Sequence, residues 1–119
     1  MTTTGKQHQA SPDWHQTLPA ALVAPIPAGA RSALLLRHGS MSLRLYQPRG
    51  QDPQTPHDQD EIYVIARGSG TFLVAGERFA FRPGDVLFAP AGAEHRFEAM
   101  SEDFATWVVF WGPAGGEAA

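Results

Sequence analysis

The sequence predicts an all-β domain, a double-sheet jelly roll or small barrel of about eight short antiparallel strands. Gly (12) and Pro (10) are plentiful and are spread along the 119 residues, as in chains with many tight turns. Between them lie short runs rich in apolar residues, of the length that strands have. No convincing helical pattern separates these runs, and the chain length fits one domain.

The expected elements follow one another closely along the chain. We expect residues 1–12 to be a disordered tail and residues 13–31 an N-terminal arm, in which Pro19, Pro25 and Pro27 exclude one continuous helix. The barrel occupies residues 32–111, and the Gly/Ala-rich residues 112–119 form a flexible tail. Each predicted strand is bounded by turn residues, and the strands are 32–38, 41–47, 61–67, 71–74, 77–81, 86–89, 94–99 and 104–111.

Gly39 and Ser40 separate the first two strands, which predicts a tight hairpin. In residues 41–47, an apolar set at 41, 43 and 45 alternates with Ser42, Arg44 and Tyr46, as in a half-buried strand. Two interpretations of Arg44 stay open: the solvent side of its sheet, or an ion pair across a dimer.

The bulk composition excludes several classes of function. The net charge is −3 and no run of Lys or Arg occurs, so nucleic acid is not an expected partner. With no cysteine, the chain has neither disulfides, nor thiolate metal ligands, nor a cysteine nucleophile. The polar N-terminus lacks a signal-peptide core, and no apolar stretch is long enough for a membrane span. We therefore expect a cytoplasmic protein that contacts no membrane.

Two polar clusters carry the functional signal. In strand 94–99, alternation places His95, Phe97 and Ala99 on the inward face. An inward imidazole left without a partner would cost about 1–3 kcal/mol, so His95 needs a hydrogen bond or a metal. The second cluster is residues 57–61, where His57, Gln59 and Glu61 share the parity of Tyr63. Two imidazoles and one carboxylate suit Fe(II), and also Mn, Ni or Zn.

The pattern of these residues resembles the cupin family. Residues 50–68, with His57, Glu61 and Gly68, resemble the first cupin motif, G-x5-H-x-H-x(3 or 4)-E-x6-G. Residues 84–95 match the second motif, G-x5-P-x-G-x2-H-x3-N, through His95. In this alignment Thr55 stands at the first histidine of the family, Gly50 lies one residue too close, and Ala99 replaces the final Asn. The resemblance implies a cupin jelly-roll barrel with a divalent transition metal on His57, Glu61 and His95.

The residues around this set are candidates for the pocket. Tyr63 and Phe97 share the inward parity, Gln59 could be a fourth and weak ligand, and Thr55 could bind a metal-bound water. Each also has a simpler explanation. Tyr63 and Phe97 would be core aromatics, Gln59 would belong to a solvated acidic turn, and Thr55 would be an ordinary loop residue.

Two classes of function stay open at this stage. The resemblance implies either a metal-dependent enzyme acting on a small molecule, such as a dioxygenase, isomerase or lyase, or a non-catalytic barrel that binds a metal or ligand, including a metal-free vestige. It also implies a homodimer, because the apolar arm at residues 18–26 has no place among the eight strands and could cover a strand edge of a second copy.

Overall fold

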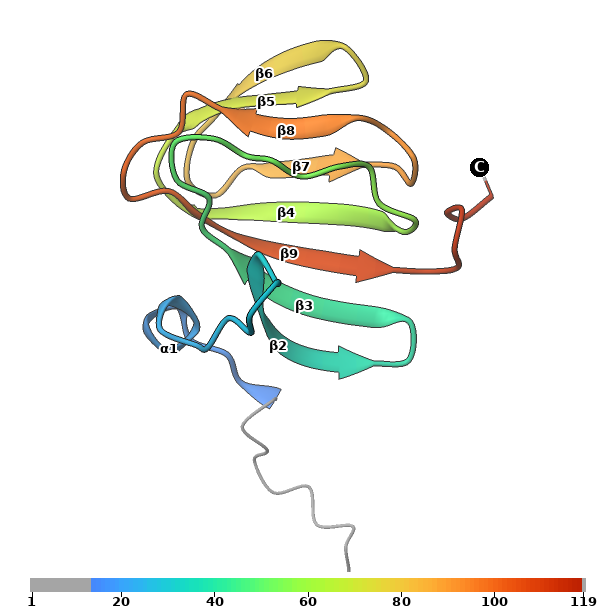
Figure 1. Cartoon of the computed structure of the whole chain (residues 1–119), viewed down its shortest axis with the longest axis horizontal. Coiled ribbons are helices and arrows are strands. Elements are labelled where there is room, and N and C mark those ends of the chain that lie inside the picture. Colours follow the sequence, from blue (N-terminus) through green and yellow to red (C-terminus); the bar gives the residue numbers. More distant parts are fainter. Residues whose placement is uncertain (1–13, 119) are drawn as a thin grey trace, which may run out of the picture.

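The computed structural model describes residues 14–118, so the tail predicted for residues 1–12 lies outside the described residues. Eight antiparallel strands form two facing sheets (Figure 1). The predicted all-β jelly roll is confirmed, although the two sheets do not close into one continuous barrel. The strands lie within one or two residues of their predicted positions: β2 (Ser32–His38), β3 (Met41–Tyr46), β4 (Asp60–Arg67), β5 (Gly70–Val74), β6 (Glu77–Phe81), β7 (Val86–Ala89), β8 (His95–Glu98) and β9 (Ala105–Trp111).

The larger sheet has the order β2-β3-β9-β4-β7, and the smaller sheet has the order β6-β5-β8. An aromatic core fills the space between them. Phe97 lies at its centre, with ring centroids 4.8 Å from those of Tyr63 and Phe104 and 5.0 Å from that of Phe72. All four rings are almost fully buried. Tilted and edge-on contacts of this kind favour one fixed arrangement of the core, on which the site residues rest.

The hairpin of β2 and β3 contains an irregularity that matters for the pocket. Its two-residue turn at Gly39 and Ser40 is the one predicted, since His38 pairs with Met41. Leu34 pairs with Arg44, but the next pair is Leu36 with Leu43, so β2 holds one extra residue in a β-bulge. Beyond the bulge, the side chains of β2 exchange faces.

Strand β3 is buried on both faces, which a half-buried pattern does not describe. Ser42, Arg44 and Tyr46 face the space between the sheets, where they line a cavity. On the opposite face Leu45 is also buried and pairs with the buried Ala33. The N-terminal arm lies beside this end of the hairpin (Figure 1), and the Gln47 amide donates a hydrogen bond to the Leu22 carbonyl.

The arm contains a short helix, α1 (Leu18–Leu22), that sequence reasoning did not anticipate. Thr17 caps it by accepting a hydrogen bond from the Ala20 amide, and Pro19 sits in its first turn, where a missing N–H is tolerated. Prolines therefore exclude a long helix here but not one of five residues. Within residues 14–118, no helix is long and apolar enough to cross a membrane.

Gly68 shows why a glycine ends the first motif. Its φ of +87° lies in the left-handed region, and a Cβ at this position would stand 2.6 Å from the Phe104 Cα. Because Gly68 has no Cβ, its backbone can pass close to that of Phe104 where the chain leaves β4 for the smaller sheet.

The buried Asp52 carboxylate links the two sheets. Asp52, in the loop between β3 and β4, accepts hydrogen bonds from the Tyr46 hydroxyl of the larger sheet and from the Phe97 amide of the smaller sheet, the latter at 2.8 Å. Phe97 belongs to β8, an edge strand, so the loop also pairs a backbone donor that the sheet leaves open.

The C-terminal residues 112–118 lie against the same end of the molecule as residues 57–61. The Gly115 amide donates to the Asp58 carbonyl at 2.7 Å, and the Glu117 amide donates to an Asp60 carboxylate oxygen at 2.9 Å. The predicted flexibility of this tail stays a prediction.

Candidate metal centre

Three side chains from distant parts of the sequence meet between the sheets: His57, Glu61 and His95. His57 lies in the β3–β4 loop three residues before β4, Glu61 is the second residue of β4, and His95 is the first residue of β8. One ligand atom from each lies within 4.8 Å of the other two. His95 Nε2 is 2.6 Å from Glu61 Oε1, and His57 Nε2 is 4.0 Å from the same oxygen. The structure thus brings together the three residues that the sequence predicts as ligands.

The chemistry of these atoms fits a divalent cation. Glu61 and His95 are buried, and within residues 14–118 neither the two Glu61 oxygens nor His95 Nε2 has a hydrogen-bond partner apart from the 2.6 Å ion-pair contact between the two side chains. His95 Nδ1 lies 2.9 Å from the Ala93 carbonyl oxygen, which can only accept. Nδ1 therefore carries a proton, and Nε2 is directed at the centre. A backbone carbonyl on the outer nitrogen commonly orients metal-bound histidines.

The two imidazoles have opposite pKa shifts. Burial lowers the pKa of His57 more than the Glu61 carboxylate raises it, so its neutral, ligand-competent form is favoured. For His95, burial also acts to lower the pKa, but the close Glu61 carboxylate and the Ala93 carbonyl together outweigh it and raise the pKa. Without a cation, the protonated form of His95 is thus favoured beside the Glu61 carboxylate; a bound cation would displace that proton.

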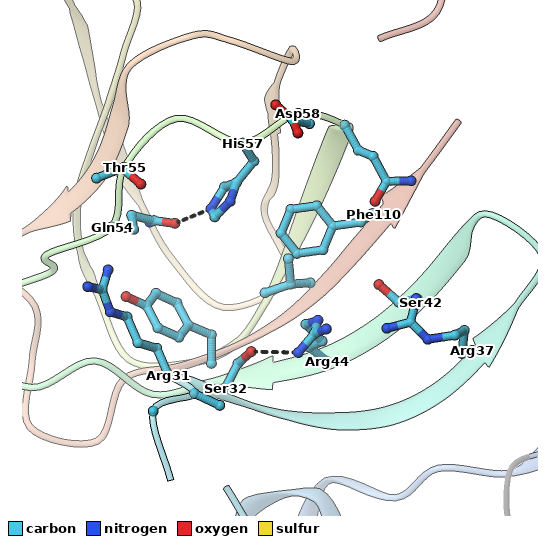
Figure 2. A pocket seen from close by; sticks show the side chains of 15 residues that line it. Arg31, Ser32, Arg37, Ser42, Arg44, Gln54, Thr55, His57, Asp58 and Phe110 are labelled. Carbon is cyan, nitrogen blue, oxygen red and sulfur yellow. Dashed lines mark hydrogen bonds between the residues drawn. The ribbon is translucent and has the colours of Figure 1, made fainter. Parts of the chain in front are cut away.

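His57 is held by two neighbours. The Phe110 ring of β9 packs edge-on against its imidazole, with centroids 5.0 Å apart. Gln54 Oε1 lies 3.2 Å from His57 Nε2 (Figure 2). The same oxygen accepts a hydrogen bond of 3.2 Å from the Tyr63 hydroxyl. The Gln54 amide nitrogen donates a hydrogen bond of 2.5 Å to the Asp52 carboxylate. This bond orients the amide so that its oxygen, and not its nitrogen, faces the triad.

The four other candidate residues lie in different surroundings. Tyr63 and Phe97 are buried in the aromatic core and are not among the residues that line the cavity; the Tyr63 ring lies beside that of His95. Thr55 lines the cavity and is exposed. Gln59 lines the cavity as expected, but its amide nitrogen is directed at the Ser40 and Gly112 carbonyls, to which it donates. Its role as a fourth ligand is wrong, because residues 57–59 precede β4 and do not follow its alternation.

Sequence reasoning missed Gln54, whose amide oxygen is the additional oxygen beside the triad. It stands one residue before Thr55, the position that aligns with the missing histidine. A second departure concerns Ala99, which was expected to continue the inward face of strand 94–99. Ala99 is exposed with φ +52°, because β8 ends at Glu98 and the chain turns there.

A cavity of about 540 Å³ opens beside His57 (Figure 2). The residues that line it come from the arm, β2, β3, the β3–β4 loop and β9. Its volume falls in the range of small-molecule sites. Of the triad only His57 is among the lining residues, so a ligand in this cavity would meet the His57 imidazole first.

Comparison with known proteins places these features in a family. Residues 42–111 match the cupin domain family, which is more than half of the chain. An uncharacterized protein of Streptomyces coelicolor is 39% identical over 80 residues, which cover 66% of this chain and 76% of that protein.

Two solved structures illustrate the likeness of fold. Protein NMB1881 of Neisseria meningitidis is 20% identical, with a TM-score of 0.64 over 82% of this chain and 99% of that one. A protein of Ralstonia eutropha, described as a candidate mannose-6-phosphate isomerase, is 26% identical, with a TM-score of 0.56 over 83% of this chain and 98% of that one.

Proposed function

Since this chain belongs to the cupin family, we propose that it is a metal-dependent cupin that acts on a small molecule in the cavity beside His57. The observation that carries the proposal is the convergence of three ligand atoms, from His57, Glu61 and His95, within 4.8 Å of one another at a site where Glu61 and His95 are buried. The buried Glu61 carboxylate has one close ion-pair partner, His95 at 2.6 Å, and keeps lone pairs that a divalent cation would use. A cytoplasmic location stays a prediction.

Each residue of the site would have a distinct role. His57, Glu61 and His95 hold the ion, which would supply Lewis-acid or redox chemistry to the ligand. Gln54 Oε1 contacts His57 Nε2, so this nitrogen would exchange that hydrogen bond for the ion, and the amide oxygen would lie beside it. Burial, then the nearby Glu61 charge, raise the pKa of Tyr63 well above its usual value, so its hydroxyl keeps the proton and acts as a donor. Tyr63 is therefore suited to donate a hydrogen bond, as it does to Gln54, and not to exchange its proton during a reaction.

We propose dioxygenase, isomerase and lyase chemistry as the reaction classes, because three protein ligands leave coordination positions free for a substrate and for water or O₂. The alternative is a non-catalytic barrel. Thr55 in place of the first motif histidine favours it, as does the 2.6 Å contact of Glu61 with His95, the spacing of an ion pair that needs no metal.

Metal content and thermal stability test the proposal together. We expect protein purified without chelator to hold close to one equivalent of Fe, Mn, Ni or Zn by elemental analysis. Removing the ion should lower the melting temperature, and saturation with it at 100 times Kd should restore about 2.7 kcal/mol. Oxygen consumption and product analysis with small acids then separate an enzyme from a binding barrel. Protein without metal, whose stability no transition metal changes, would contradict the proposal.

We also propose that the protein is a homodimer. In the single chain the arm buries Ala21 against its own barrel, yet Val23 and Ile26 stay 82% and 47% exposed. These apolar side chains are available to a second copy. Light scattering should give twice the chain mass of 12.9 kDa at micromolar concentration. A mass of one chain would exclude the dimer, and a dimer that survives deletion of residues 1–27 would show that the arm is not what holds it.

A further inference from the structure

One wall of the cavity is built from cationic side chains. Arg31 precedes β2, Arg37 lies in β2 and Arg44 lies in β3, and all three line the cavity (Figure 2). They are three of eight arginines in a chain whose net charge is −3. Among the lining residues only Asp58, which is exposed, carries a carboxylate. The positive charge is therefore concentrated on the β2–β3 side of the cavity.

These arginines have few protein partners. Arg31 donates to the Pro53 carbonyl at 2.9 Å, and Arg44 donates to the Ser32 hydroxyl at 3.4 Å. No carboxylate in residues 14–118 forms an ion pair with any of the three, whereas Arg78 and Arg96 both pair with Glu98. A guanidinium carries five N–H donors, so most donors of this wall are available to a ligand.

The bulge in β2 places Arg37 on this wall. Paired residues share a face of the sheet, and Arg37 pairs with Ser42, which faces the cavity together with Arg44. Without the extra residue, Arg37 would fall on the outer face. The resulting arrangement is electrostatically unfavourable in the free protein: burial, then the charge of Arg37, lower the pKa of Arg44. Bulges that turn a side chain in this way are frequent beside binding sites.

We propose that Arg37 and Arg44, with Arg31 at the end of the same wall, form a subsite for the anionic group, a carboxylate or a phosphate, of a small-molecule ligand. The planar guanidinium fork matches both groups. That this ligand is the substrate rests on the proposed metal-dependent function, but the subsite itself needs no metal. A small anion would occupy the arginine wall while the remainder of the molecule extends toward His57.

Anion binding by the full-length protein, stripped of metal with chelator, tests the subsite directly. The probes are inorganic phosphate, malonate and succinate, followed by calorimetry and thermal shift at constant ionic strength, with chloride as the reference anion. We expect saturable binding of at least one probe, and its preference identifies phosphate or carboxylate as the group recognised. Arg44→Gln should weaken that binding at least about tenfold.

Matched variants separate the subsite from general charge. Arg82→Gln removes the same charge from an exposed turn outside the cavity and should change affinity less than twofold. Arg44→Lys should retain part of the affinity, since the charge stays and the fork is lost. The melting temperature of Arg37→Gln, measured without anion, should not fall, because a repulsion is removed. The proposal would be overturned if no probe binds more tightly than chloride does. It would also be overturned if Arg44→Gln and Arg82→Gln lose the same amount of affinity for the probe.

The two proposals fail separately. If metal-free protein binds the anion and no transition metal binds, the subsite stands and the metal-dependent function does not. If metal binds and no probe anion does, the metal centre stands and the arginine subsite is wrong.

Discussion

Replacing His95 or His57 with alanine should reduce bound transition metal by at least about tenfold. Each substitution removes one of three protein ligands, and water replaces it poorly. His95→Ala also leaves the buried Glu61 carboxylate without its neighbour. The folding of this variant is therefore checked before its metal content is measured. His57 is half-buried, and His57→Ala should keep the fold. Elemental analysis after purification without chelator, with metal-to-protein ratios for each variant, measures the effect.

The matched control for this experiment is His38→Ala. His38 is exposed at the end of β2 and takes no part in the triad, so its removal should leave metal content unchanged. Glu61→Gln keeps the shape of the side chain and removes its charge, and should also lose metal. Near-stoichiometric metal in both His57→Ala and His95→Ala would show that the ion, if any, binds elsewhere.

The second large effect is expected at Asp52. Asp52→Ala should lower the free energy of unfolding by about 3–5 kcal/mol, because the Phe97 amide and the Tyr46 hydroxyl both lose their buried acceptor. The Gln54 amide loses its anchor in the same step. Urea unfolding, with midpoint and slope fitted together, gives this difference. Asp52→Asn keeps one carbonyl oxygen and should cost less.

Asp58→Ala is the control in the same loop. Its side chain is exposed, and we expect a change within about 0.5 kcal/mol. A loss as small for Asp52→Ala as for Asp58→Ala would mean that the two sheets dock without the carboxylate between them.

The sequence predicted the strands well because turn residues and strand ends coincide in this chain. Glycine and proline at the turns leave little freedom for the boundaries, and β2, β6 and β7 have the bounds expected from them. His95 was placed correctly for a related reason: β8 is short and regular, so alternation decides the face of His95 and Phe97.

Alternation failed where its physical basis is absent. Gln59 lies before β4 begins, and Ala99 lies after β8 ends, so neither obeys the two-residue period. In β3 the half-buried pattern predicts that the polar face is the solvent side, but this face lines the cavity. The apolar face, on the other side of the strand, is buried near the arm. Loop residues such as Asp52 and Gln54 carry no period at all. Their importance comes from contacts with β8 and β4 that only the folded chain brings together.

The double attachment of the β3–β4 loop also limits how its length can change. Loops usually tolerate insertions and deletions because only their ends are held. Here Asp52 is held between the two sheets and His57, five residues later, is held beside Glu61, so the spacing between them is fixed from both sides. Length variation among relatives should therefore accumulate in other turns, such as the exposed one at Gly39 and Ser40, and leave the segment from Asp52 to His57 constant.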